Sequence, residues 1–227
     1  MRGRDLAALL FLAGLGALLA SVMAELGFGN PPLRAGGPIL EQSPSQVGAA
    51  NIVTSVVLAY RGMDTLVELT ILFTAATAAG MVLGQGTRAG RSQSPAGFIL
   101  STAADALFPF LLVLGAYIIL HGHLTPGGGF QGGTILAVAF FLPLLAQPNA
   151  GIDERITTWV EGSAGAAFLL IALAGLAGDG FMAPFPGGEL GELLSAGSLP
   201  VLYLALGLKV GAELAGLMGR LLTEDEA

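Results

Sequence analysis

HLTPGGGFQGG, residues 123–133, separates two apolar segments that are each long enough to be a membrane helix. Pro126 has no amide hydrogen, and glycine loses more backbone entropy on ordering than any other residue, so local propensity does not make this segment helical. Irregular backbone at membrane depth is tolerated only where it is buried in protein or lines a polar cavity. We therefore expect Phe130 and Gln131 to fix this glycine-rich segment against neighbouring helices.

The composition around this segment predicts an all-α integral membrane protein. Apolar residues make up 54% of the chain and charged residues 11%, and the mean hydropathy is +0.78. These values depart from the soluble average toward a membrane protein. A helix needs about 20 apolar residues to cross about 30 Å of hydrocarbon. About six segments meet or approach this length, at residues 6–24, 65–84, 101–121, 133–147, 161–178 and 197–219.

The arginines predict how the spans are oriented. Six spans with a cytoplasmic N-terminus follow the positive-inside pattern, and the arginines then inside are Arg2, Arg4, Arg88, Arg91, Arg155 and Arg220. Both termini are expected in the cytoplasm, and the chain in the cell inner membrane. Residues 47–60 are predicted to form an interfacial or re-entrant helix, because a seventh span here would place Arg88 and Arg91 on the outer side of the membrane. The first span resembles a signal peptide, but we expect it to be retained. Residues 25–45 are predicted to form a loop.

Composition also excludes several functions. The chain has no cysteine, so it forms no disulfide, thiolate-ligated iron–sulfur cluster or covalently attached c-type haem. A net charge of −7 argues against nucleic acid as a partner. Residues 127–132 match G-x-G-x-x-G, but the dinucleotide fingerprint requires a preceding strand, and here an apolar helix precedes it. We expect no cofactor.

Lys209 is the strongest single-residue signal. It lies about twelve residues inside the last predicted span, where an unpaired lysine costs about 2.5–3.5 kcal/mol on insertion scales. Glu213 follows at i+4, on the same helix face. The pair either neutralises itself or contributes to a hydrated ion or proton route, and we favour the second interpretation. Gly207 and Gly211 on this span predict close helix packing.

Two further groups of ionisable residues are candidates. Asp64 and Glu68 lie at i and i+4 near the start of the second span, where they either cap the helix or line an ion route, with Arg61 available to pair with either. His121 and His123 follow the third span. They either carry protons or make structural hydrogen bonds. Two histidines at i, i+2 point in different directions, so no metal site is expected.

The thirteen residues 121–133, HGHLTPGGGFQGG, resemble the signature of the B subunit of Mrp-type multisubunit Na+/H+ antiporters and the corresponding subunit of membrane-bound hydrogenases. Residues 51–83, with YRGMDTLVE at 60–68, resemble the end of the antiporter A subunit and the hydrogenase E subunit. The resemblance implies a fusion, with residues 1–87 as the E-like two-span segment, 88–97 as a linker and 98–227 as the B-like four-span domain. The residues with a structural role would be Arg61, Thr125, Pro126, Gly127, Gly128, Gly129, Phe130, Gln131, Gly132 and Gly133.

The resemblance implies a non-enzymatic subunit of a complex that exchanges Na+ for H+. Its partners would be the lipid bilayer, the large A- and D-type antiporter subunits and the small C-, E-, F- and G-type subunits. The ion or proton route would then involve Asp64, Glu68, His121, His123, Lys209 and Glu213. Two other hypotheses remain: a membrane-arm subunit of a hydrogenase or ferredoxin-driven complex, and a scaffold that seals contacts between other subunits.

Overall fold

The computed structural model describes residues 3–25, 36–83, 96–147, 153–177 and 187–224. The chain divides into two compact units, Met1–Ile39 and Leu40–Ala227. In the first unit, α1 (Gly3–Glu25) coincides with the first predicted span, and its apolar described part is Leu12–Ala24. The described residues contain helices and no strand, which confirms the all-α prediction.

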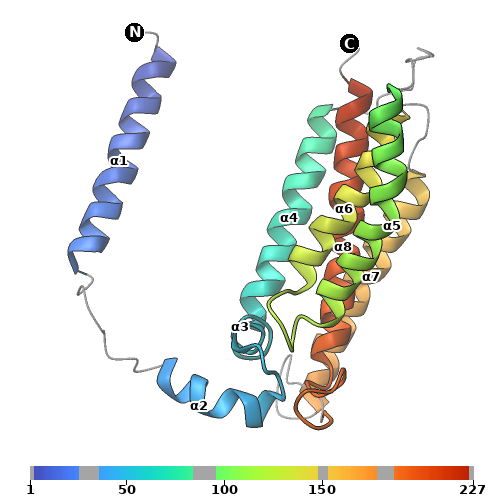
Figure 1. Cartoon of the computed structure of the whole chain (residues 1–227). Helices are drawn as coiled ribbons and strands as arrows, with labels where there is room; N and C mark the ends of the chain where they lie inside the picture. Colours follow the sequence, from blue (N-terminus) through green and yellow to red (C-terminus); the bar gives the residue numbers. More distant parts are fainter. Residues whose placement is uncertain (1–2, 26–35, 84–95, 148–152, 178–186, 225–227) are drawn as a thin grey trace. The chain divides into compact units, whose positions relative to one another are not determined.

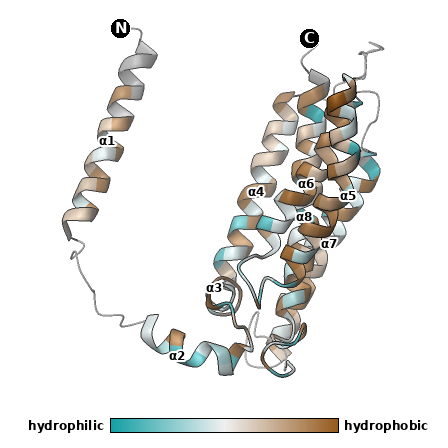
Figure 2. Ribbon diagram, viewed as in Figure 1, coloured by the Kyte–Doolittle hydropathy of each residue, from teal (hydrophilic) through white to brown (hydrophobic). Residues whose placement is uncertain are grey.

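The second unit holds five helices that are long and apolar enough to cross a membrane, by length and composition, among the described residues. They are α4 (Gly62–Leu83), α5 (Phe98–Leu120), α6 (Gly129–Ala146), α7 (Glu154–Ala174) and α8 (Leu199–Glu224), and η2 (Gly175–Ala177) extends α7. These helices agree with the remaining five predicted spans. They alternate in direction along one bundle (Figure 1), and Figure 2 shows that hydrophobic residues recur along all five helices.

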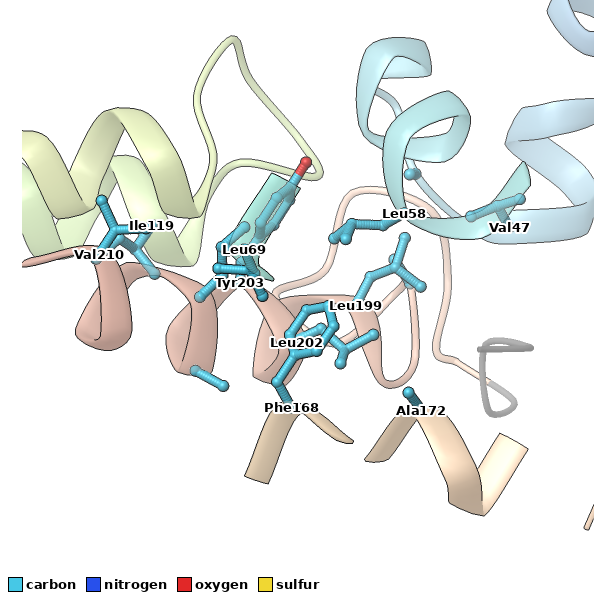
Figure 3. Packing of buried hydrophobic residues seen from close by; sticks show 14 residues of the cluster. Val47, Leu58, Leu69, Ile119, Phe168, Ala172, Leu199, Leu202, Tyr203 and Val210 are labelled. Atoms are coloured by element: carbon cyan, nitrogen blue, oxygen red, sulfur yellow. The ribbon is translucent and has the colours of Figure 1, made fainter. Parts of the chain in front are cut away.

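α8 is the central helix of this bundle. It packs against α4, α5, α6 and α7, and 56% of its span is buried, compared with 11% for α4. Leu199, Leu202, Leu206 and Val210 form its buried stripe, and Figure 3 shows Phe168 of α7 packed against it. α8 therefore positions the other helices of the bundle. α4 lies at its periphery, and one face of α4 is not covered by the described residues.

Glycines allow the central helices to approach closely. A Cβ atom on Gly132 of α6 would lie 2.7 Å from the Gly115 carbonyl oxygen of α5. A Cβ atom on Gly133 would lie 2.7 Å from the Gly207 carbonyl oxygen of α8, and one on Gly211 would lie 3.2 Å from the Gly133 oxygen. Because backbone oxygens cannot swing aside as side chains do, these contacts exclude larger residues. The predicted close packing through Gly207 and Gly211 is confirmed.

The segment between the two predicted N-terminal spans is more helical than expected. Part of the loop predicted for residues 25–45 is the helix α2 (Gly36–Val47). That prediction was wrong because Pro38 occupies the first turn, where backbone amides have no intrahelical acceptor anyway, and Pro44 is accommodated within the helix. α2 ends before Gly48, whose φ of 70° favours glycine.

The predicted interfacial segment 47–60 is also shorter and less regular than expected. It contains α3 (Ile52–Thr54) and the π-helix η1 (Ser55–Tyr60). Asn51 begins α3, because its side-chain oxygen accepts a hydrogen bond from the Val53 amide at 3.1 Å. The segment leads directly into α4.

Candidate functional site

Three charged side chains meet inside the bundle. Lys209 and Glu213 lie one turn apart on α8, and their Nζ and Oε2 atoms are 3.1 Å apart. The same ammonium lies 3.4 Å from Oε1 of Glu161 on α7. Lys209 is 8% exposed and Glu213 4% exposed. One ammonium therefore faces two carboxylates, of which Glu213 is buried and Glu161 partly exposed, and we call these three residues the charge cluster.

Neighbouring helices complete the surroundings of Lys209. Its Nζ atom lies 4.9 Å from the ring centroid of Phe73 on α4, a cation–π distance. Its aliphatic stem passes Gly165 of α7, where an added Cβ would lie 3.6 Å from the lysine Cδ atom. Carboxylates and an aromatic face offset the cost of burying the Lys209 side chain about 15 Å along α8.

A cavity of about 540 Å³ adjoins the charge cluster. Phe73 and Thr77 of α4, Glu161 of α7 and Glu213 of α8 contribute to its wall. It extends along the helices to Arg220, near the end of α8. Oε1 of Glu213 is buried and has no hydrogen-bond partner among the described residues. A cavity of this size, whose wall includes the carboxylates of Glu161 and Glu213, has room for several water molecules.

The structure places the two predicted carboxylates of α4 elsewhere. Asp64 forms an exposed ion pair with Arg61 at the start of the helix. Glu68 is exposed on the outer surface of α4, and within the described part of the chain it has no ion-pair partner. The structure thus joins Lys209 and Glu213 but not Asp64 and Glu68.

Glu161 and Phe73 belong to the site although neither was predicted there. The sequence placed Glu161 near the membrane surface, since it begins the fifth predicted span. Its inclusion depends on how α7 packs against α8, and the sequence pattern does not encode that register.

The glycine-rich loop that precedes α6 is held by hydrogen bonds from polar side chains of α3, with its N-cap residue, and of α8. The Asn51 side-chain amide donates to the carbonyl oxygens of Gly122 and Thr125, at 2.7 and 3.0 Å. The Thr54 hydroxyl donates to the Gly122 oxygen at 2.6 Å, and the Tyr203 hydroxyl donates to Thr54 at 2.8 Å. Figure 3 shows the Tyr203 hydroxyl directed away from the apolar cluster. These contacts hold the irregular part of the segment, up to Gly128. Residues 129–133 were also expected not to form helix, but they are the first residues of α6, where Gly132 and Gly133 pack closely against α5 and α8.

Glycine is required in this loop for space and for backbone geometry. Gly128 has φ of 142°, and an added Cβ would lie 3.0 Å from Cε1 of Tyr203. A Cβ on Gly122 would lie 2.7 Å from the Gly128 Cα atom. Phe130 packs against the apolar core, as expected, whereas Gln131 is exposed at the start of α6.

The two histidines lie at this loop and not at the charge cluster. The His121 ring stacks on Tyr117 with centroids 4.3 Å apart. His123 is fully buried, and its Nε2 atom lies 3.3 Å from the Glu192 carbonyl oxygen. Among the described residues, no three ligands of the His, Cys, Asp and Glu types gather into a metal site. Burial lowers the pKa of His123, and the nearby His121 lowers it further, whereas the hydrogen bond to Glu192 raises it.

The lowered pKa of His123 predicts a pH-dependent stability. The unfolded chain binds a proton more readily than the folded one, so stability falls as pH decreases below the ordinary histidine value of about 6.5. We expect the thermal midpoint of the purified chain to decrease between about pH 7.5 and about pH 5.5, on either side of that value. His123→Gln should reduce this decrease, whereas the control His121→Gln should keep most of it. An unchanged slope in His123→Gln would contradict the assignment.

A bundle of apolar helices with an ammonium and two carboxylates at its centre defines a multi-pass membrane protein with ionisable groups inside the membrane region. Residues 99–216, more than half of the chain, match the family described as a domain related to the MnhB subunit of Na+/H+ antiporters, and the chain belongs to this family. It is thus a membrane subunit of the cation/proton antiporter type.

Two solved structures and one relative show how far the likeness extends. One chain of the membrane-bound sulfane sulfur reductase, an archaeal respiratory membrane complex, is 38% identical with a TM-score of 0.82, over 98% of this chain and 99% of that one. One chain of the Mrp complex from Dietzia sp. DQ12-45-1b shares the fold, with 24% identity and a TM-score of 0.77, over 100% of this chain and 27% of that one. The B subunit of the Na(+)/H(+) antiporter of Bacillus subtilis is 37% identical over 38% of this chain and 61% of that protein.

Proposed function

We propose that this chain is a subunit of a multisubunit complex in the cell membrane that exchanges Na+ for H+, and that its charge cluster borders a hydrated part of the ion route. The family supports an antiporter subunit. The observation that carries the proposal is the buried ammonium of Lys209 between Glu161 and Glu213, beside a cavity. Ionisable groups at such depth are costly, and those that persist usually serve transport.

The uncovered face of α4 supports a second part of the proposal, contact with another membrane subunit. Glu68 is the seventh residue of α4, about 9 Å along the helix at 1.5 Å per residue. A carboxylate exposed there faces lipid unless another chain covers it, and lipid penalises the charge. We infer that an antiporter-type subunit covers Glu68, with Asp64 and Arg61 at the edge of the contact. A, D, C, E, F and G types of subunit are the expected partners, and His121 and His123 would have structural roles.

The organisation of the chain is consistent with a fusion of two subunit types. The family match begins at residue 99, so it includes α5 to α8 and leaves α1 to α4 outside. We propose that residues 1–87 are the E-like segment and residues 98–227 the B-like domain. Most of the proposed linker, 88–97, lies outside the described residues. In this arrangement both termini are cytoplasmic.

A second candidate function is a place in the membrane arm of a redox-driven complex. The match to a chain of an archaeal respiratory membrane complex extends over nearly the whole of both chains, and this favours the candidate. In that setting electron transfer would occur on other subunits, while the charge cluster would keep its role beside the ion route.

Mass spectrometry of the intact complex distinguishes the two settings. The complex would be purified gently through a tag on this chain, and its subunits and metals identified. We expect several other membrane subunits of the antiporter type, without iron or nickel. Iron–sulfur subunits recovered in fixed proportion with this chain would support the redox-driven complex and contradict the antiporter complex. Recovery of this chain without other membrane subunits would contradict both.

A further inference from the structure

The charge cluster has an unbalanced charge. Lys209 contributes one positive charge, while Glu161 and Glu213 contribute two negative charges when ionised. The described residues of α4 that face the cluster, Phe73 and Thr77, are uncharged. The buried end of the cavity therefore has one negative charge in excess. Burying an uncompensated charge is costly, and a bound cation or proton removes that cost.

A second observation shows where the compensating charge binds. Lys209 approaches Oε2 of Glu213, and this leaves Oε1 of the same carboxylate buried without a hydrogen-bond partner among the described residues. Both glutamates line the cavity, so a small ion can reach either of them through it. Arg220 lies at the other end of the cavity, exposed, about 10 Å along α8 from Glu213 at 1.5 Å per residue. Because Arg220 is exposed, water and salt screen its charge.

We propose that Glu161, Lys209 and Glu213 form a binding site for a single exchangeable monovalent cation, either a proton or Na+. The ammonium of Lys209 neutralises one carboxylate, and the bound cation neutralises the other. A proton bonds to a carboxylate oxygen, and an arriving Na+ releases it to the cavity water, so charge is conserved. This inference rests on the proposed function, since exchange of the two ions at one site is an elementary step of antiport.

Removing either carboxylate should leave the cluster neutral. In Glu161→Gln, Lys209 pairs with Glu213 alone; in Glu213→Gln, it pairs with Glu161 alone. Each variant then needs no cation. Two different single substitutions should therefore abolish the same binding event, which two independently protonated glutamates would not show.

Infrared difference spectroscopy of the purified complex in nanodiscs tests this inference. The wild-type protein in choline chloride should show the carbonyl band of one protonated carboxylic acid that is absent from both Glu161→Gln and Glu213→Gln. Glu192→Gln, an exposed change outside the cavity, is the matched control and should keep the band. Replacing choline with Na+ should remove the band, because the arriving Na+ displaces the proton; a band that persists in Na+ would contradict exchange of the two ions at this site.

Three further results would overturn the cation site. The band could be absent from the wild type in choline chloride, it could survive in one of the two cluster variants, or the control could lose it. The proposed function is tested separately, by ion exchange and by the composition of the complex. If the two cluster variants exchange ions at an altered rate but keep the band, the cluster affects the ion route without binding the cation. If they lose the band but exchange ions at the wild-type rate, the cluster binds the cation but does not lie on the ion route.

Discussion

Lys209→Met is expected to abolish ion exchange by the reconstituted complex. Methionine fills similar space without the charge, so the buried Glu213 and the partly exposed Glu161 are left as two carboxylates with no ammonium. Removing one partner of a buried ion pair costs about 3–5 kcal/mol. We expect the rate of Na+-driven proton movement into proteoliposomes to fall at least about tenfold, the factor that corresponds to 1.4 kcal/mol.

A double substitution separates charge from packing in this experiment. Lys209→Met combined with Glu213→Gln returns the cluster to a single negative charge, as in the wild type. The double variant should assemble better than Lys209→Met alone and recover part of the exchange. If Lys209→Met assembles normally and exchanges at the wild-type rate, the cluster is only structural.

Gly133→Val is expected to prevent the bundle from folding properly. The first added atom would lie 2.7 Å from the Gly207 carbonyl oxygen and 2.9 Å from Cβ of Val210, so α6 and α8 must separate. Overpacking of a tight core typically costs about 1–3 kcal/mol, and a backbone contact offers little room to relax. We expect a large loss of monodisperse protein in size-exclusion chromatography and a lower thermal midpoint.

The matched control is Gly219→Val, near the end of α8, where an added Cβ meets no atom within 4 Å. Both substitutions place the same side chain in a helix, so helix propensity is matched and only packing differs. Equal stability of the two variants would show that α6 and α8 do not depend on this close contact.

The sequence predicted the helices well because a membrane span is recognised from apolar length alone. Residues 65–84 and 197–219 were expected as spans, and α4 and α8 include nearly all of them. It also predicted that Pro126 and the adjoining glycines need support from elsewhere. It did not identify Asn51, Thr54 and Tyr203 as that support, because these residues are distant in sequence from the loop and belong to two other elements, α3 and α8.

The candidate site was predicted only in part. Lys209 and Glu213 were paired correctly, because i and i+4 spacing fixes neighbours on a helix. Glu161 was missed because its distance from Lys209 depends on the register between α7 and α8. Glu68 illustrates the opposite difficulty, since spacing shows that it shares a face with Asp64 but not whether that face points into or out of the bundle.

The central claim is that this chain works within a complex that exchanges cations for protons. Its most direct test is to add Na+ to proteoliposomes that contain the purified wild-type complex and a pH indicator. We predict a rapid change in internal pH that an equal concentration of choline does not produce and that Lys209→Met lacks. A complex that contains all its subunits but shows no pH response to any monovalent cation would contradict the account.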